Sequence, residues 1–339
     1  MALWLKEGSD NDIVVSTRAR LARNVEGIPF PYTEAGKQKL NDIMEPAVST
    51  FVDGSDFSLI KIRDLSRIES EKLIENHLIS RDLLKNDAGA IIISPDESLS
   101  IMLMEEDSYR IQSLISGLDT DRALSLVNEM SDMLGKKVRY AFDPELGFLT
   151  GCITNVGTGL RISVMLHLPA LTASGRMSML ISQAAKLGLT VRGIYGEGST
   201  ALGNIYQISN QKTLGLDEVE ITKSVTNAVK SLIDMERSTR DHMFKKDRNK
   251  YIDTIWRSLG LLKYSKMTDL KESLKLLSDI NIGKAEGLIT GTSHSEIYNA
   301  IISVMPANIW EKQSTSEQLM VKRAGILREI FKKTEVQEV

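Results

Sequence analysis

Residues 90–115 read AIIISPDESLSIMLMEEDSYRIQSLI, and this stretch predicts three consecutive strands. Two short apolar, partly β-branched runs, 90–94 and 99–104, flank Asp96-Glu97-Ser98, which is typical of a hairpin turn. Residues 109–115 alternate between apolar and polar side chains as a third strand. Because short turns join the strands, the sheet that they begin is expected to be mainly antiparallel.

The same patterns continue on both sides of this stretch. Further strands are predicted at 13–24, 57–62, 161–168, 190–195 and 205–209, and helices at 64–76, 119–134 and 177–187. The character changes after Gly215: residues 217–246 have one long helical pattern, and nearly everything to Glu335 reads as helix. The predicted fold class is therefore α+β, with helices flanking the sheet and a helical C-terminal domain after it.

Composition limits the possible functions. The chain has 339 residues, of which 42% are hydrophobic, and a net charge of −3, so no general basic field indicates nucleic acid as a partner. The single cysteine, Cys152, excludes a disulfide framework and a cysteine-rich metal site. No apolar run approaches the 18 residues of a membrane span, and residues 1–12 lack the apolar segment of a signal peptide. A cytoplasmic protein is expected.

The strand at 13–24 carries an unusual set of charges. It contains Ser16-Thr17-Arg18-Ala19-Arg20-Leu21-Ala22-Arg23, and strand alternation puts Arg18 and Arg20 on the same face. A guanidinium is forked and always charged, and it matches phosphate oxygens. Two of them on one face could clamp a polyphosphate. Taken alone, the pattern equally fits a solvated edge of the sheet.

Three acids, Glu105-Glu106-Asp107, follow directly after an apolar strand. Their mutual repulsion suggests a bound cation, and Arg110 lies within local pairing reach of Asp107. A carboxylate here is a candidate to hold a cationic substrate. The alternative is the tip of a hairpin in water.

Two further segments combine glycine with polar side chains. The loop Gly151-Cys152-Ile153-Thr154-Asn155-Val156-Gly157-Thr158-Gly159-Leu160-Arg161 is able to bring backbone amides close to phosphate, although it is neither a Walker loop nor a dinucleotide fingerprint. Cys152 in this loop is either a partly exposed thiolate or a buried small side chain. Arg192-Gly193-Ile194-Tyr195-Gly196-Glu197-Gly198-Ser199 places one acid between glycines, which fits a loop that closes over a substrate or a plain surface turn.

Together, these segments resemble the phosphagen kinases. Members of that family carry Ser-Thr-Arg-x-Arg, Asn-Glu-Glu-Asp-His-x-x-Arg, Cys-Pro-Thr-Asn-x-Gly-Thr and Arg-Gly-x-x-Gly-Glu, and close versions of all four occur here in the same order, between about residues 13 and 215. Within the family, the segments 75–80, 164–169, 194–199 and 208–211 look like those of the McsB family of protein arginine kinases.

The resemblance implies a phosphagen-kinase-like catalytic domain over residues 1–250, and a domain over 251–339 for dimerisation and substrate docking. It assigns ATP phosphate binding to five arginines, Arg18, Arg20, Arg110, Arg161 and Arg192, and places His77 near the nucleotide. Glu106 and Glu197 match the carboxylates that hold the guanidinium, and Cys152 matches the thiolate beside it. Glu106 is the expected base, since a neighbouring acid raises its pKa.

The expected cofactors are ATP and Mg²⁺, with the metal held mainly by phosphate and water, so no protein metal motif is expected. The implied substrates are arginine-bearing proteins, which the enzyme would mark for the ClpC–ClpP protease with the help of a McsA-type activator. A homodimer is implied as well. Kinases of free guanidino compounds carry a helical N-terminal domain that closes over the substrate, whereas residues 1–12 alone precede the first motif here.

The chain departs from the family pattern in several places. Met104 and Ser108 replace the usual Asn and His around Glu106, and Ile153 replaces the proline after the cysteine. At the C-terminus, many relatives carry Arg-Asp-x-x-Arg-Ala, which forms a phosphoarginine pocket, whereas this chain has Leu319-Met320-Val321-Lys322-Arg323-Ala324. Because the leading Arg-Asp pair is absent, this pocket is not expected to work in the same way. Arg323 remains, and the alternative for it is an ordinary cation on a helix surface.

Two other functions remain open at this stage. One is a kinase of free arginine or another small guanidino compound, which turnover of free arginine would reveal. The other is a catalytically weak adaptor that only holds arginine-bearing partners. Substitution of Glu106 separates an enzyme from an adaptor, because an adaptor would keep its effect on its partners.

Overall fold

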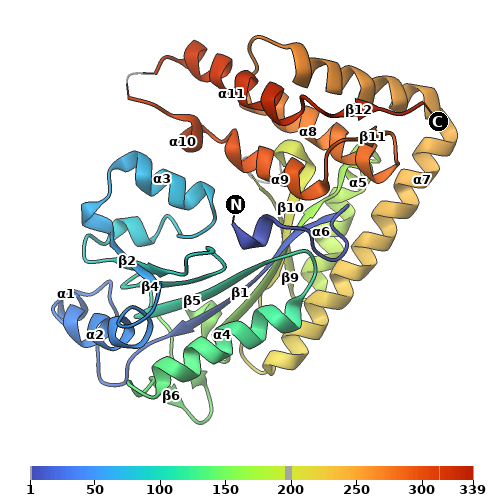
Figure 1. Ribbon diagram of the computed structural model, residues 1–339. Helices are drawn as coiled ribbons and strands as arrows, with labels where there is room; N and C mark the ends of the chain where they lie inside the picture. The colour runs from blue at the N-terminus through green and yellow to red at the C-terminus, as the bar shows by residue number, and fades with distance from the viewer. Residues whose placement is uncertain (1, 195–200, 313, 339) are drawn as a thin grey trace.

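A central antiparallel sheet organises the catalytic part of the chain (Figure 1). The computed structural model describes residues 2–194, 201–312 and 314–338. Eight strands pair in the order β2-β3-β4-β5-β1-β8-β10-β9, and each neighbouring pair is antiparallel. Their bounds are β1 Val14–Arg23, β2 Ser58–Lys61, β3 Ala90–Ile93, β4 Leu99–Leu103, β5 Tyr109–Ser116, β8 Leu160–His167, β9 Leu189–Gly193 and β10 Ile205–Asn210. The α+β prediction and the hairpin at 90–103 are confirmed.

One face of the sheet is apolar and is covered by helices. Alternate residues of the central strands, such as Leu21, Ile111 and Ile162, point to this face and are fully buried. They form one hydrophobic core with the helices α2 (Leu40–Phe51), α4 (Thr120–Gly135), α6 (Met177–Lys186) and the first part of α7 (Glu218–Tyr264). Helix α4 turns Val127 and Met130 towards this core. Burial of such side chains is the main favourable contribution to folding.

The other face is polar at its centre and apolar on both flanks. One flank is a small core of Ile91, Ile93 and Met102 under α3 (Arg67–Glu75). The other flank joins sheet residues, among them Leu114 and Met165, to the core of the C-terminal helices. The polar centre between them holds Arg18, Arg20, Arg110, Gln112, Arg161, Ser163, Gln207 and Ser209, which alternation along the strands places on one side.

The C-terminal part is helical and packs across the end of the sheet (Figure 1). It contains the end of α7, α8 (Leu270–Ala285), α9 (His294–Ser303), α10 (Pro306–Ile309) and α11 (Ser316–Ile330), with a two-stranded ribbon of β11 (Ile289–Thr290) and β12 (Glu335–Val336). The N-terminal turn η1 (Leu3–Leu5) lies between the two parts, because Trp4 belongs to the C-terminal core and contacts between η1 and both β5 and α9 are extensive.

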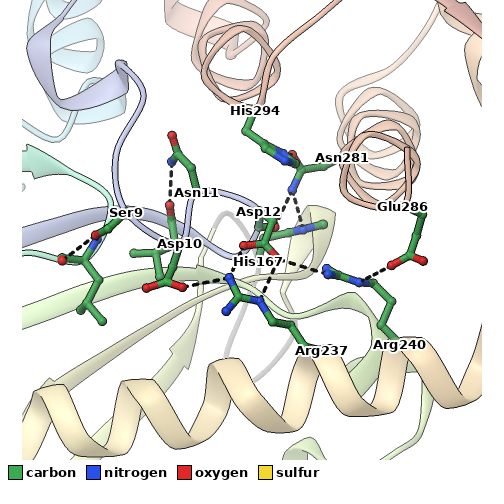
Figure 2. A network of polar contacts seen from close by, with 12 residues as sticks. Ser9, Asp10, Asn11, Asp12, His167, Arg237, Arg240, Asn281, Glu286 and His294 are labelled. Carbon is green, nitrogen blue, oxygen red and sulfur yellow. Dashed lines mark hydrogen bonds and ion pairs between the residues drawn. The ribbon is translucent and has the colours of Figure 1, made fainter. Parts of the chain in front are cut away.

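A polar network joins the two parts away from the arginine face (Figure 2). Asp12, just before β1, accepts hydrogen bonds from Arg237 and Arg240 of α7, and Arg240 also pairs with Glu286 after α8, at 2.8 Å. Asn281 of α8 reaches both the Asp12 carbonyl and the ring of the buried His167, at 3.2 and 2.9 Å.

Helix α7 runs through the predicted domain boundary at 250/251. Asp217 caps its first turn, and a capping box with Glu220 fixes its start where the sequence predicts it. The predicted end at Lys246 coincides with a break at Asp247 (φ −136°, ψ 46°), after which the helix continues to Tyr264. No helix within residues 2–194, 201–312 and 314–338 is long and apolar enough to cross a membrane.

Candidate active site

Four arginines from three neighbouring strands lie on the polar face of the sheet. Arg20 of β1 stands directly opposite Arg161 of β8, and on its other side opposite Gln112 of β5, two residues from Arg110. Arg18 lies two residues from Arg20 on the same face. Because β1 is in the middle of the sheet, these side chains are half-buried. The alternative of a solvated edge is therefore wrong.

The contacts of these arginines within the protein are few and mostly neutral. Arg18 donates to Gln207 Oε1 at 2.8 Å, and Arg161 donates to Ser209 Oγ at 3.0 Å. The Nε atoms of Arg20 and Arg161 are buried and have no hydrogen-bond partner within the described part of the chain. Buried polar atoms are normally paired, so donors left in this state suit a ligand that brings acceptors.

The electrostatics of the face agree with that interpretation. Burial, then the charges of Arg110 and Arg161, lower the pKa of Arg18 to about 10. Burial, then Arg192 and Arg110, also lower the pKa of Arg161. The lowered pKa values mean that burial, and then the neighbouring arginines, disfavour each positive charge on this face. A polyanion on this face relieves the repulsion, and the site is therefore suited to phosphate groups.

The acid turn after β4, residues 105–107, carries three carboxylates that have different partners. Glu105 is buried and accepts from Arg110 Nη1 with both oxygens, at 2.5 and 2.6 Å, and its Oε1 also accepts from Ser80. The predicted pairing of Arg110 with Asp107 is wrong. Asp107 is buried too and instead accepts from Asn24 Nδ2 at 2.7 Å and from the Gly151 amide at 2.6 Å. A hairpin tip in water is excluded for these two acids.

Glu106 is the acid that remains accessible. Its carboxyl is half-buried, and burial, then Asp107 and Glu105, raise its pKa. The direction agrees with the prediction, although burial is a larger cause than the neighbouring acids. Glu106 borders a cavity of about 320 Å³, and the other lining residues are Tyr32, Lys37, Asp82, Lys85, Asn86 and Glu105. A partly desolvated carboxylate beside a cavity is an acceptor suited to a cation or a proton.

The glycine-bearing loop brings Cys152 to the same place. The Gly151 amide is held by Asp107, and the Gly151 Cα packs so closely on Glu106 that a Cβ would lie 2.7 Å from the Glu106 carbonyl oxygen. Cys152 is half-buried, and its Sγ lies 3.0 Å from Thr154 Oγ1. Cys152 is also near enough to Arg161 to oppose slightly the lowering of the Arg161 pKa, so the loop adjoins the arginines. Cys152 is therefore not a buried small side chain, and the thiolate stays a prediction.

The remaining predicted residues lie around this centre or outside the description. His77 follows α3 in a left-handed conformation (φ 61°), is half-buried beside Arg18 and packs its ring edge-on against Trp4. Burial, then Arg18, lower the pKa of His77 to about 3. Arg192 is exposed on the edge strand β9. Glu197 falls outside the described residues.

The sequence reasoning missed several residues that hold the site together. Glu105 neutralises part of the arginine cluster, and Gln207 and Ser209 extend the polar face onto β10. The only available signal was alternation, since Gln207 and Ser209 alternate with the buried Tyr206 and Ile208. Among the described residues, no three His, Cys, Asp or Glu side chains are grouped as metal ligands.

The alternative of an ordinary surface cation is wrong for Arg323 at the C-terminus. It is 5% exposed, and its guanidinium donates to the carbonyl oxygens of Val304 at 3.0 Å and Thr268 at 3.3 Å. It is therefore a buried side chain that joins α11 to the ends of its neighbours, and not a cation on a helix surface.

Comparison with known proteins agrees with this geometry. The chain matches the ATP:guanido phosphotransferase C-terminal catalytic domain over residues 39–239 and the protein-arginine kinase McsB C-terminal domain over residues 248–339. It is 40% identical to the protein-arginine kinase of Clostridium novyi over 99% of this chain and 100% of that protein. It is 38% identical to that of Bacillus subtilis, over 97% and 93% of the two chains.

Solved structures show the same catalytic fold. The duplicated taurocyamine kinase of Schistosoma mansoni, solved with transition state analogue components, aligns with a TM-score of 0.58 and 26% identity, over 68% of this chain and 34% of that one. A lombricine kinase aligns with a TM-score of 0.59 and 24% identity, over 70% and 71% of the two chains, which concerns the fold alone. The match over the catalytic part and the identity over almost the whole length place this chain in the ATP:guanido phosphotransferase family, among the protein-arginine kinases.

Proposed function

We propose that this protein transfers the γ-phosphoryl group of ATP to arginine side chains of other proteins. The observation that carries the proposal is the position of Arg18, Arg20, Arg110 and Arg161 on one sheet face, next to Glu106 and the Cys152 loop. A site for a polyanion thus adjoins a site for a cation, which is what ATP and a guanidinium require. The relatives of similar length, named protein-arginine kinases, support the choice of acceptor.

The arginine face binds the phosphates in this proposal. Phosphoryl transfer depends mainly on positioning and on neutralising charge on the transferred group. Arg18, Arg20, Arg110 and Arg161 hold the phosphate chain, and Arg192 approaches from the edge strand. Mg²⁺ carried by the phosphates and water supplies further positive charge. His77 borders the nucleotide at the Trp4 end of the face.

The acid turn and the cysteine loop bind the acceptor. A guanidinium with a pKa above about 12 is a poor nucleophile until it loses a proton. Glu106 accepts that proton as a guanidino nitrogen attacks the γ-phosphorus; the N–P bond forms, the bond to the bridging oxygen breaks, and ADP leaves with the electron pair. The raised pKa of Glu106 makes it a stronger base than an ordinary glutamate. The Cys152 thiolate and Glu197 add negative charge around the guanidinium.

The biological setting of the reaction is a further part of the proposal. A protein that phosphorylates arginines in the cytoplasm would mark stress-damaged proteins for ClpC–ClpP degradation and respond to a McsA-type activator. Its C-terminal domain, from about residue 251, would serve docking and homodimer formation. The match of that region to the McsB C-terminal domain is what supports this part.

The decisive test of the reaction uses mass spectrometry. The purified full chain is incubated with MgATP and an arginine-rich protein such as casein, with and without activator, and acid-labile phosphate is sought on arginine. We expect phosphoarginine, and we expect Glu106→Gln to reduce its formation by about 10²- to 10⁴-fold, as is typical for loss of a general base. Absence of phosphoarginine in the wild type under both conditions would refute the proposal.

Free arginine is tested in parallel as the competing acceptor. The cavity beside Glu106 is bordered by the exposed side chain of Tyr32, so a small guanidino compound could enter it as well as an arginine on a protein surface. Turnover of free arginine at a rate similar to that of casein would favour a kinase of small guanidino compounds instead.

A further inference from the structure

Glu75, the last residue of α3, makes a set of contacts that neither the sequence motifs nor the proposed chemistry explains. Its carboxylate accepts from the backbone amide of Ala307 with both oxygens, at 2.9 and 2.9 Å, and from the amide of Asn308 at 3.1 Å. The Asn308 side chain donates to Glu75 and to Asn76 as well, at 3.3 and 3.2 Å. An anion that accepts several amide hydrogen bonds is held firmly, because charge-assisted bonds are stronger than neutral ones.

These contacts join distant parts of the chain. Ala307 and Asn308 belong to α10 in the C-terminal part, whereas α3 lies over the flank of the catalytic sheet (Figure 1). The chain just before α10 is held as well, because the Arg323 guanidinium of α11 donates to the backbone carbonyl of Val304. The end of α3 is thus attached to the C-terminal helices through one carboxylate.

His77 follows this anchored end immediately. Its left-handed backbone (φ 61°) is unfavourable for a residue with a side chain, so neighbouring contacts must hold it. Its carbonyl accepts from Gln112 Nε2 at 3.0 Å, which fixes it to β5 beside the arginine face.

The other side of the His77 ring also depends on the C-terminal part. Trp4 packs edge-on against the ring, with centroids 5.7 Å apart. The next residue, Leu5, accepts from Ser295 Oγ at 2.5 Å and from Asn299 Nδ2 at 3.2 Å, both on α9. The C-terminal helices therefore hold His77 from two directions, through Trp4 and through Glu75.

We propose that Glu75 is a positioning residue that attaches the His77 turn to α10, so that the C-terminal helices set the geometry of the nucleotide end of the arginine face. The inference rests on the proposed function in one respect, that nucleotide binds on this face. It gives the C-terminal part a role within the site, in addition to any role in docking. The residue acts through His77 and does not itself reach the reacting atoms.

The test is a thermodynamic cycle of MgADP binding, measured by titration calorimetry on the full chain. The variants are Glu75→Ala, His77→Ala and the double variant. We expect each single change to weaken MgADP binding by about tenfold, and the double variant to bind no more weakly than His77→Ala. Residues that act through one another are non-additive in this way, whereas an independent structural defect adds to the loss.

A matched control lies one turn earlier on the same helix. Glu71 pairs with Arg81 at 3.0 Å and makes no hydrogen bond or ion pair with α10 among the described residues. Glu71→Ala removes the same charge and is expected to change MgADP affinity by less than twofold. If Glu75→Ala unfolds the protein, Asn308→Ala removes the side-chain donor alone and is expected to weaken binding about threefold, again with no effect in the His77→Ala background.

The possible results separate the inference from the proposed function. Unchanged affinity in Glu75→Ala or in His77→Ala, or losses that add in the double variant, would overturn the inference. A wild type that binds MgADP but makes no phosphoarginine would refute the proposed reaction, while the cycle would still decide the role of Glu75. A wild type that binds no MgADP would overturn both.

Discussion

Arg20 of β1 and Arg161 of β8 are direct partners across an antiparallel pair, and each has a buried Nε without a hydrogen-bond partner in the part of the chain that the structure describes. Like charges opposite each other destabilise a sheet. The fold tolerates the pair because apolar cores flank it on both sides and because Glu105 supplies one buried negative charge. The remaining repulsion makes this face suited to an anion.

Substitution of one arginine of this pair is expected to raise the stability of the free protein and to weaken anion binding. Arg20→Met removes the repulsion and the unpaired donor, so we expect the free protein to melt about 2–4 °C higher, equivalent to about 1 kcal/mol. The same variant should lose the rise in melting temperature that MgADP gives the wild type. Scanning calorimetry checks both, with Arg122→Met on the exposed side of α4 as a control that changes neither. A lower melting temperature for Arg20→Met would contradict the explanation.

Gly151 of the cysteine loop lies in close steric contact with Glu106, the proposed base. A Cβ at this position meets the Glu106 carbonyl oxygen at 2.7 Å and Glu106 Cγ at 3.3 Å. Gly151→Ala should displace Glu106 and lower the rate of phosphoarginine formation by about 10²-fold, because a shift of about 1 Å is enough for such a loss.

Gly260 gives the matched control for that substitution. It lies inside α7, and a methyl group added to its Cα would meet no described atom within 4 Å. Gly260→Ala should leave the rate unchanged and stabilise the protein by about 1 kcal/mol through helix propensity. Equal rates for the wild type and Gly151→Ala would show that the contact does not position Glu106.

Glu105 predicts a large effect on stability. It is fully buried and pairs with Arg110 through both oxygens. Glu105→Gln leaves a largely buried guanidinium without its counter-charge, so denaturant unfolding should show a loss of about 3 kcal/mol. Adding Arg110→Met to that variant should restore much of the loss, since the unpaired charge is then gone. If the double variant is less stable than the single one, the pair is not the cause.

We expect His167 to make the folding stability of the protein depend on pH. Burial, then the charges of Arg240 and His294, lower its pKa to about 3. Its ring is held neutral between Ser278 and Asn281, at 2.7 and 2.9 Å. Figure 2 shows the Asn281 side of this contact. Below pH 6.5 the unfolded chain takes up a proton that the folded chain does not. Stability is therefore complete above pH 6.5 and falls as the pH drops towards 3.

The measurement is a series of urea titrations between pH 4 and pH 8. We expect the wild type to lose on the order of 1.4 kcal/mol per pH unit from this histidine below pH 6. His167→Gln should reduce that slope while keeping most of the ring's hydrogen bonds. An unchanged slope would mean that His167 is not the group that titrates.

Alternation and turn residues were enough to predict most of the sheet. Local sequence predicts three features correctly, because each depends on neighbours within a few residues. They are the hairpin around Asp96-Glu97-Ser98, the strand with Arg18 and Arg20, and the helix start at Asp217. The family resemblance followed from the motifs, and the full-length matches confirm it.

Local sequence does not predict which side chains pair once the chain has folded. In the sequence, Asp107 and Glu105 lie at comparable separations from Arg110. Only the β4–β5 register decides that Arg110 forms its ion pair with Glu105. Burial of Arg323 likewise depends on how α11 packs against the ends of other helices.

The sequence by itself determined which residues share a strand face and which segments carry the chemistry, because local periodicity governs both. The tertiary structure decided which of those segments meet. The order β5-β1-β8 brings three arginine-bearing strands together, and the packing of α10 on α3 ties the C-terminal helices to His77. Such contacts depend on the burial of surfaces far apart in the chain, and no local pattern encodes them.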